Sequence, residues 1–477
     1  MAPTCSRWTV SSLCLALLAA CAGSGDDASR RDASTDPISL DGGEGDASGD
    51  GGSDARVIDI DMDAPDPCEG VSGVVEIGGD ITEATTWCGR ATYRLTAPVF
   101  VGSGDEAAPA VLTLEPGTRI EGGTGGADGE NALVVTTSGR IEAVGTAAEP
   151  VVFTSGNAPG TARPGDWGGL VLLGRAPLND PRGTASVEGL DPRGGLSEFG
   201  GADPTHDCGT LRYVRVEFGG FSFSAGVELN TLTVAGCGSG TDLDYVQTHG
   251  GLDDGFEFFG GTANATHLVV SAMDDDGIDT DLGYTGTLQF VLVQASLTDH
   301  AFEMDNREGT PGARPQSSPT VWNFTLVGFD FPGTSGIELA EGTGATLRNG
   351  VILGYGATEG IDADDSDQIA ALDAGQVRVE HCLFAGNGTD IVNGSSVWDP
   401  TAPAARNVFG VTGDVYAAPR NTLAPDFTPT GAVDLSGGAT PSGLPGDPDF
   451  DASASYLGAF APGGIDWMAG WTAFPAP

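Results

Sequence analysis

Residues 250–307 read GGLDDGFEFFGGTANATHLVVSAMDDDGIDTDLGYTGTLQFVLVQASLTDHAFEMDNR and repeat one short pattern three times. A small residue, an apolar residue and an acid follow one another, and the acids are Glu257, Asp279 and Glu303. These acids are 22 and 24 residues apart, and a period of about 20 to 25 residues is typical of a solenoid whose coils stack on one another. The stretch therefore predicts a parallel β-helix.

The same pattern recurs at residues 226–229, 336–339 and 360–363. Because side chains alternate across a strand, the apolar members should stack inside the solenoid and the acids outside it. The predicted inner column is Val227, Phe256, Ile278, Phe302, Ile337 and Ile361, and the predicted outer column is Glu228, Glu257, Asp279, Glu303, Glu338 and Asp362. A second strand in each coil is indicated by further apolar runs, at residues 267–270, 288–293, 322–326 and 377–379.

The first 20 residues have the features of an export signal. A polar start with Arg7 precedes an apolar run, residues 13–20, that is too short to span a membrane. Leu18-Ala19-Ala20-Cys21 resembles a bacterial lipobox, and this resemblance implies cleavage before Cys21 and lipidation of its thiol. An ordinary secretory signal with an incidental cysteine is the alternative. The expected protein is exported and held by a lipid anchor at the cell envelope, at the outer membrane of a bacterium.

Residues 21–67 are rich in Gly, Ser, Ala and Asp and contain no aromatic residue. Such a segment cannot bury enough apolar surface to offset its ordering entropy, and its like charges extend it. We expect a disordered tether that joins the lipidated Cys21 to the folded part of the chain.

The chain carries a formal net charge of −47, and every one of its 20 basic residues is an arginine. The absence of lysine excludes P-loop nucleotide binding, Schiff-base catalysis and a Ser-Lys hydrolase, and no nucleotide or organic cofactor is expected. Nucleic acid is excluded as a partner because the charge would oppose binding. Divalent cations and neutral or cationic polymers remain open, and a salt-rich habitat could produce the same acidity.

Three of the eight cysteines belong to the predicted signal peptide and lipidation site. In an exported protein the other five suggest disulfides, most simply Cys68 with Cys88 and Cys208 with Cys237. Cys382 is then left over, as a buried free thiol in a strand.

Several segments resemble the opening coils of a family of secreted bacterial β-helix proteins, a pectin-lyase-like solenoid with no settled activity. They are residues 112–120, LTLEPGTRI, residues 139–146, GRIEAVGT, residues 167–176, WGGLVLLGRA, and residues 213–220, YVRVEFGG. The resemblance implies an all-β fold, a single right-handed parallel β-helix. We expect it over residues 68–397, with a cap on its first coil and residues 398–477 as the cap on its last, because solenoid ends need covering.

Adjacent coils place outward acids about 4.8 Å apart, where two carboxylates repel by about 0.9 kcal/mol in water-like dielectric and about 3.5 kcal/mol at an effective dielectric of 20. Screening by salt, proton sharing or a bound cation would relieve this repulsion. Ca²⁺ is the expected cation, since it prefers hard oxygen ligands, and His300 beside Asp299 could join a metal site. The candidate ligands are Asp253, Asp254, Glu257, Asp275, Asp276, Asp279, Asp281, Asp299, Glu303 and Asp305.

The expected function is that of an envelope lipoprotein whose acidic face binds Ca²⁺ and engages a surface polysaccharide or a partner protein, without catalysis. One alternative is a polysaccharide lyase or hydrolase that uses Asp254, Asp276 and Asp279, with Arg307 as the base. Residues 275–279 are similar to one acidic motif of polygalacturonases, but the Gly-His-Gly and Arg-Ile-Lys elements of that family are absent. A second alternative is a structural envelope protein without a ligand.

Overall fold

The computed structural model describes residues 66–475 apart from 127–128, 191–192, 225 and 296–297. Residues 67–477 form one compact unit, and the features below belong to it. The predicted signal peptide, the lipidation site Cys21 and almost all of the predicted tether lie outside the described residues. Within the described ranges, no helix is long and apolar enough to span a membrane.

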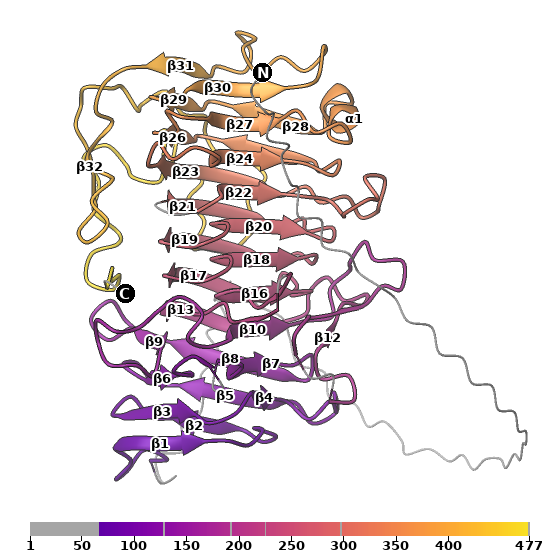
Figure 1. Ribbon diagram of the computed structural model, residues 1–477, viewed down its shortest axis with the longest axis vertical. Coiled ribbons are helices and arrows are strands. Elements are labelled where there is room, and N and C mark those ends of the chain that lie inside the picture. Colours follow the sequence, from indigo (N-terminus) through magenta and orange to yellow (C-terminus); the bar gives the residue numbers. More distant parts are fainter. Residues whose placement is uncertain (1–65, 127–128, 191–192, 225, 296–297, 476–477) are drawn as a thin grey trace, which may run out of the picture. The chain divides into compact units, whose positions relative to one another are not determined.

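In the described part of the chain, ten parallel strands stack into one sheet, with neighbouring strands coming from successive coils (Figure 1). In stacking order they are β4 (Val99–Val101), β7 (Ala132–Val135), β10 (Gly169–Leu173), β16 (Leu232–Ala235), β18 (Phe256–Phe259), β20 (Ile278–Asp281), β22 (His300–Met304), β24 (Ser335–Leu339), β27 (Glu359–Ala363) and β30 (Thr389–Asn393). Glu257, Asp279 and Glu303 pair in register, and the apolar residues that precede them do the same. The register continues to Asp362, so both predicted columns are confirmed from β18 to β27.

A second sheet contains seventeen parallel strands, counted over the described residues. In chain order they are β1 (Gly73–Ile77), β2 (Thr85–Trp87), β3 (Ala91–Leu95), β5 (Ala110–Leu114), β6 (Arg119–Glu121), β8 (Gly139–Val144), β9 (Val151–Thr154), β13 (Gly209–Glu217), β17 (Asp242–His249), β19 (Asn264–Ser271), β21 (Thr287–Ala295), β23 (Thr320–Gly328), β25 (Ala345–Arg348), β26 (Val351–Leu353), β28 (Val377–Glu380), β29 (Leu383–Ala385) and β31 (Val408–Val411). The middle coils each use one long strand here, whereas the coils nearer the ends divide the same path between two short strands. The fold is therefore a parallel β-helix, as predicted.

Each long strand bends at one residue with a left-handed backbone. The φ angles of Tyr213, Tyr245, His267, Phe290 and Asn323 lie between 51° and 60°, a region that non-glycine residues rarely adopt. The rings of the first four stack from coil to coil, with centroids 4.5, 4.1 and 4.8 Å apart. Ring pairs of this kind contribute about 0.5–1.5 kcal/mol each, which helps to offset the backbone strain.

Apolar side chains fill the space between the two sheets in one continuous core. A short helix, α1 (Ile369–Asp373), adds Leu372 to this core. The small residue at the start of each repeated pattern has a steric cause, because a Cβ atom on Gly255 or Gly277 would lie 2.5 Å from a backbone oxygen of the next coil. Close stacking of the coils therefore favours a small residue at this position, and that residue begins each copy of the repeated pattern.

The predicted outer column differs from the structure at its N-terminal end. Glu228 belongs to β15 (Val227–Glu228), which pairs antiparallel with β14 (Ser222–Ser224) in a separate two-stranded sheet. Thr233 takes the expected place of Glu228, in register with Glu257. Placing Val227 and Glu228 at the head of the two columns was wrong because both residues belong to this hairpin, which precedes β16 in the chain and lies outside the ten-stranded sheet.

Nearer the N-terminus the outer column is apolar. Phe100, Val134 and Val171 occupy it in successive coils. A separate apolar cluster covers them, and it includes residues of β12 (Glu198–Phe199), which pairs with β11 (Ala185–Ser186). Apolar packing therefore seals this part of the ten-stranded sheet, and the column becomes polar only at Thr233.

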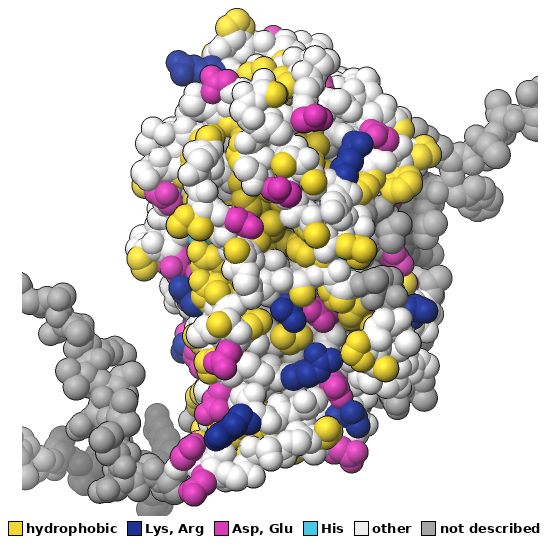
Figure 2. All heavy atoms as spheres, turned by 90° about the vertical axis from the view of Figure 1, so that its left-hand side faces the viewer, with side chains coloured by type: hydrophobic (Ala, Val, Ile, Leu, Met, Phe, Trp, Pro, Cys, Tyr) yellow, Lys and Arg dark blue, Asp and Glu magenta, His cyan; other side chains and the backbone are white. Residues whose placement is uncertain are grey.

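Most of the segment 398–477 does not cap the last coil as expected. After β31 the chain turns back along the outer side of the seventeen-stranded sheet, through a hairpin of β32 (Tyr416–Ala418) and β33 (Asp426–Pro429) (Figure 1). Trp471 packs edge-on against Tyr213 and Tyr245, with ring centroids 6.0 and 5.8 Å apart. The segment covers apolar side chains that this sheet directs outward, and Figure 2 shows hydrophobic side chains gathered over the middle of this face.

Side-chain amides of the sheet hold the backbone of this C-terminal segment. Gln247 both donates to and accepts from the backbone of Ala473, and Gln289 does the same with Asp451. Asn323 donates to the carbonyl oxygens of Ala454 and Tyr456. The segment is thus fixed to successive coils by paired hydrogen bonds as well as by apolar packing.

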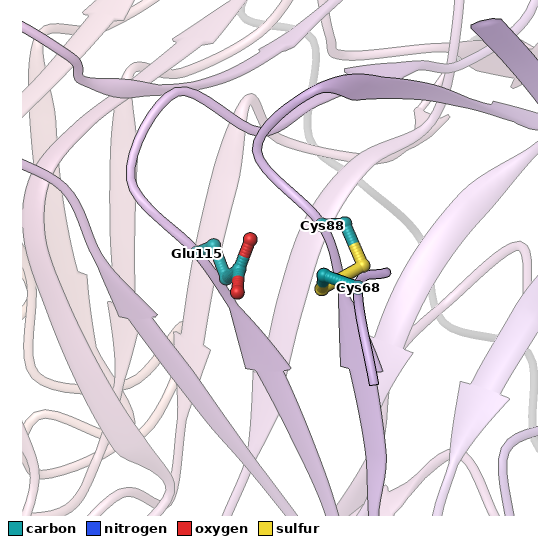
Figure 3. Close-up of side chains that lie close together, drawn as sticks. All are labelled: Cys68, Cys88 and Glu115. Atoms are coloured by element: carbon teal, nitrogen blue, oxygen red, sulfur yellow. A yellow bond between two sulfur atoms is a disulfide. The ribbon is translucent and has the colours of Figure 1, made fainter. Parts of the chain in front are cut away.

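Both predicted disulfides are confirmed, between Cys68 and Cys88 and between Cys208 and Cys237, and Cys382 is a buried free thiol. Glu115 lies beside the first disulfide (Figure 3). Its carboxylate accepts a hydrogen bond of 3.0 Å from the backbone N–H of Gly89. Because both thiols are consumed in the disulfide, this group does not form a metal centre.

Replacing Cys208 and Cys237 together by alanine should lower the free energy of unfolding by about 3 kcal/mol, because the disulfide closes a loop of 29 residues in the unfolded chain. Cys382→Ala is the matched control, since it removes an equally buried thiol without opening a loop, and it should cost about 1 kcal/mol. Urea unfolding of both variants measures the difference. Equal losses would contradict a role of the disulfide beyond packing.

Candidate metal centre

The ten predicted metal ligands lie along one side of three consecutive coils, and we call them the acidic strip: Asp253, Asp254, Glu257, Asp275, Asp276, Asp279, Asp281, Asp299, Glu303 and Asp305. Strands β18, β20 and β22 supply its outward column of Glu257, Asp279 and Glu303. The turns that enter these strands supply Asp254 and Asp276, and His300 follows at the start of β22. The coil register therefore places these acids on one side of the β-helix, but Asp281, Asp299 and Asp305 belong to none of the close groups described below.

The inner acids of the strip are buried although they point away from the core. The exposed fraction is 2% for Asp276, 7% for Asp254 and 8% for Glu257. Only Asp275 and Asp299 are exposed, and the other members are half-buried. Screening by salt at an open surface therefore cannot relieve the repulsion among the inner acids, which leaves proton sharing or a bound cation.

Three groups within the strip bring potential ligand atoms within 4.8 Å of one another. They are Asp254 with Glu257 and Asp279, Asp276 with His300 and Glu303, and Asp253 with Asp254 and Asp275. Oxygens of Asp279, Asp281 and Asp305 are shielded from solvent and have no hydrogen-bond partner. The strip therefore offers clustered oxygen atoms that the protein itself does not satisfy.

Backbone hydrogen bonds fix the acids that precede the strands. Oδ1 of Asp254 accepts from the backbone N–H of Asp276 at 2.9 Å, and Oδ1 of Asp276 accepts from the backbone N–H of His300 at 2.5 Å. Each acid is thus tied to the next coil by one oxygen, which leaves the other oxygen of the carboxylate for a neighbouring side chain or an ion.

Burial and mutual repulsion raise the pKa of most carboxyl groups in the strip. Burial, with nearby carboxylates adding to it, raises the pKa of Asp253 and Asp305 to about 8, and of Asp275 and Asp281 to about 7. The same causes hold the pKa of Asp254, Glu257 and Asp279 well above the usual range. Without a bound cation, these groups therefore retain their protons at a higher pH than an ordinary carboxyl group does.

Asp276 is the exception. Burial raises its pKa. Hydrogen bonding with Glu303, together with the charge and hydrogen bonds of His300, outweighs burial and brings the pKa below its ordinary value. Its negative charge pushes the pKa of Glu303 well above the usual range, and burial adds to this effect. The two shifts therefore have opposite directions, which favours the ionised form of Asp276 and the protonated form of Glu303.

Arginines neutralise outward acids elsewhere in the protein but not in the strip. On the seventeen-stranded sheet Arg94 pairs with Glu121 at 2.8 Å and Arg140 with Glu142 at 2.6 Å, and Figure 2 shows basic and acidic side chains side by side at the lower end of this face. Among the described residues, no arginine forms an ion pair with a member of the strip. Arginines therefore balance half-buried acids elsewhere in the described part of the chain but not in the strip.

Arg307, the predicted base of the alternative enzyme, forms an ion pair with Asp180 at 3.6 Å. Burial raises the pKa of Asp281, and the charge of Arg307 offsets part of this rise at longer range. Asp254 and Asp279 do share one group, but Asp276 belongs to the neighbouring group with His300. The predicted catalytic acids and base are thus not assembled around one position.

Two residues of the site, Asn230 and Thr233, were not among the predicted ligands, and His300 has other neighbours than the one predicted. Nδ2 of Asn230 donates to Glu257, and Thr233 lies in register with Glu257 on the outer column. His300 lies between Asp276 and Glu338, whereas the sequence suggested only its neighbour Asp299. The coil period could have predicted the place of Thr233, because this residue precedes Glu257 by 24 residues, the length of one coil.

A further group of acids, Asp242, Asp447 and Asp449, lies where the C-terminal segment meets β17. Arg212 pairs with Asp242 and with Asp449, so part of the negative charge of this group is already neutralised. This group therefore differs from the strip, whose acids form no ion pair with an arginine of the described residues.

Comparison with protein-family models finds a match over residues 79–420, to a pectate-lyase-like β-helix domain. Comparisons with curated proteins and with solved structures found no match. The family match covers most of the β-helix, including the whole acidic strip.

Proposed function

We propose, from the premise that this chain belongs to the family of pectate-lyase-like β-helix domains, that it is a non-catalytic binding protein whose acidic strip holds Ca²⁺. The observation that carries the proposal is a buried set of carboxylates with no arginine partner among the described residues. Ca²⁺ takes six to eight oxygen ligands in flexible geometry, and neighbouring coils supply such oxygens at close spacing. A bound cation would convert the repulsion within the strip into a stabilising interaction.

The burial of the acids favours a structural or binding role over catalysis. A polymer cleaved in the strip would have to reach Asp254 or Asp276, whose exposed fractions are 7% and 2%. The candidate base Arg307 is paired with Asp180 instead. A cation at this place would fix the coils and shape the surface above them rather than act on a substrate.

The proposal includes export and anchoring through the lipobox-like sequence that ends in Cys21. A tether of about 45 residues would then hold the β-helix away from the membrane, with an envelope polysaccharide or protein as its partner. Labelling of the cells with a radioactive fatty acid tests the anchor, because Cys21→Ser should abolish the label on this chain.

The test of the central proposal is thermal and denaturant unfolding of the full chain after exhaustive chelation, with and without Ca²⁺. At a hundredfold excess over the dissociation constant, binding to the folded state alone should raise the free energy of unfolding by about 2.7 kcal/mol. NaCl at equal ionic strength controls for screening and should reproduce little of this effect.

Two variants make the test specific to the strip. Glu257→Gln with Asp279→Asn keeps the shape of the neutral side chains and should abolish the response to Ca²⁺. Glu121→Gln, which removes an acid already paired with arginine, is the matched control and should leave the response intact. A Ca²⁺ response that persists in the double variant, or none in the wild type, would refute the proposal and favour a ligand-free structural protein.

A further inference from the structure

The surroundings of the acidic strip are not uniform along the coils, because one basic residue, His300, lies beside its C-terminal half. Nε2 of His300 lies 2.7 Å from a carboxylate oxygen of Glu338, and Nδ1 lies 3.3 Å from Oδ1 of Asp276. Nδ1 forms no hydrogen bond in this geometry, but a carboxylate oxygen lies within 4 Å of each ring nitrogen, and both carboxylates attract the ring when it is the imidazolium cation. The C-terminal half of the strip therefore already contains a positive charge.

The N-terminal half has no such charge among the described residues. Its group of Asp254, Glu257 and Asp279 contacts neither an arginine nor a histidine. Two further oxygens adjoin this group, since Asn230 bonds to Glu257 through its amide nitrogen and Thr233 pairs in register with Glu257. Asn230 is 5% exposed and Thr233 fully buried, yet Oδ1 of Asn230 and Oγ1 of Thr233 have no hydrogen-bond partner.

Unpartnered buried oxygens are costly, and they indicate a missing partner that accepts oxygen ligands. Rotation of the Asn230 amide by half a turn would direct Oδ1 instead of Nδ2 towards the carboxylates. The group then presents three carboxylates, an amide oxygen and a hydroxyl oxygen, the ligand types that Ca²⁺ takes, with water completing its shell.

We propose that His300 divides the strip, so that the protein binds one divalent cation, in the N-terminal half, through Asp254, Glu257, Asp279, Asn230 and Thr233. In the C-terminal half the imidazolium of His300 takes the place of a second cation beside Asp276, Glu303 and Glu338. This division rests on the proposed Ca²⁺ binding. It adds Asn230 and Thr233 as ligands and a stoichiometry of one ion, and an experiment can contradict either addition without contradicting Ca²⁺ binding itself.

The stoichiometry is tested by native mass spectrometry and isothermal titration of the full chain with Ca²⁺ at pH 7. The wild type should bind one ion, and His300→Gln should bind two, because Asp276, Glu303 and Glu338 are then left without a positive charge. His267→Gln is the matched control, since His267 also contacts a buried acid, Asp244, but Arg212 remains there as a partner. This variant should still bind one ion.

The two added ligands are tested by Thr233→Val, which keeps the side-chain shape and removes only the hydroxyl. The affinity for Ca²⁺ should fall by about tenfold or more, whereas the stability of the Ca²⁺-free protein should not fall, because the lost hydroxyl has no partner. Thr280→Val is the control, since Thr280 is equally buried and unpartnered but pairs with Phe258, whose side chain belongs to the apolar core. It should leave the affinity unchanged.

The outcomes separate the two proposals. If the wild type binds no Ca²⁺ while His300→Gln binds one, the proposed function fails and the role of His300 as a built-in cation stands. Two ions in the wild type, or one ion in both proteins, would overturn the division by His300. If His300→Gln does not fold, the comparison of Thr233→Val with Thr280→Val decides, and equal affinities would overturn the ligand assignment.

Discussion

In the absence of divalent cations, the free energy of unfolding of the protein should fall as the pH rises from about 4 to about 8. The pKa of Asp275 and Asp281 is raised to about 7 in the folded state, and that of Asp253 and Asp305 to about 8, against about 4 in the unfolded chain. Between these values the unfolded chain releases protons that the folded protein retains, so folding stability falls with pH. The contribution is fully present below about pH 4 and is lost once the pH exceeds about 8.

The expected loss is several kcal/mol, because each unit of pKa shift corresponds to about 1.4 kcal/mol and the half-buried Asp253, Asp281 and Asp305 all contribute, whereas solvent screens the exposed Asp275. Urea unfolding at intervals between pH 4 and pH 8.5, in chelator, measures this loss. The stabilisation by Ca²⁺ should grow over the same range, since the cation replaces the protons. Asp281→Asn should flatten the curve in chelator, and a metal-free protein whose stability is constant or rises towards pH 8 would contradict the prediction.

Trp471→Ala should lower the free energy of unfolding by about 3–5 kcal/mol, although this residue lies outside the β-helix core. Its side chain is fully buried, packs against Tyr213 and Tyr245, and donates a hydrogen bond of 2.8 Å to the carbonyl oxygen of Trp467. Its loss leaves a cavity beneath the C-terminal segment and exposes the ring stack of the seventeen-stranded sheet.

Ile465→Ala is the matched control for this prediction. It truncates another large apolar side chain of the same segment, but Ile465 is 90% exposed, so its effect should stay within about 0.5 kcal/mol. Denaturant unfolding followed by tryptophan fluorescence and by circular dichroism measures both variants. Similar small losses in the two variants would mean that the segment lies on the β-helix without stabilising it.

The repeated pattern was sufficient to predict the coil register, because stacking coils must keep the same residue on the same side. The step from Glu257 to Asp279 is one coil, and the two residues pair directly. A step that includes an excursion breaks this correspondence, which is why Glu228 was placed in the column that Thr233 occupies. The disulfides were predictable because each joins cysteines close in sequence.

The burial of the strip was not predictable from the period of the repeat. The alternation of apolar and acidic residues shows which side chains point out of the β-helix, but it does not show whether other residues cover them. The location of the C-terminal segment was also missed, because its anchors are single polar side chains such as Gln247 and Asn323. These residues lie in strands otherwise rich in apolar residues and have no periodic pattern of their own. His300 was noticed through Asp299, but its contact with Glu338 depends on the next coil, 35 residues further on.

A crystal structure of the full chain grown with Ca²⁺, with anomalous diffraction to identify the ion, shows whether the strip holds a cation. We expect an ion 2.3–2.6 Å from oxygens of Asp254, Glu257 and Asp279. The contradicting result is the same three side chains without an ion, with Glu257 and Asp279 hydrogen-bonded to each other through a shared proton.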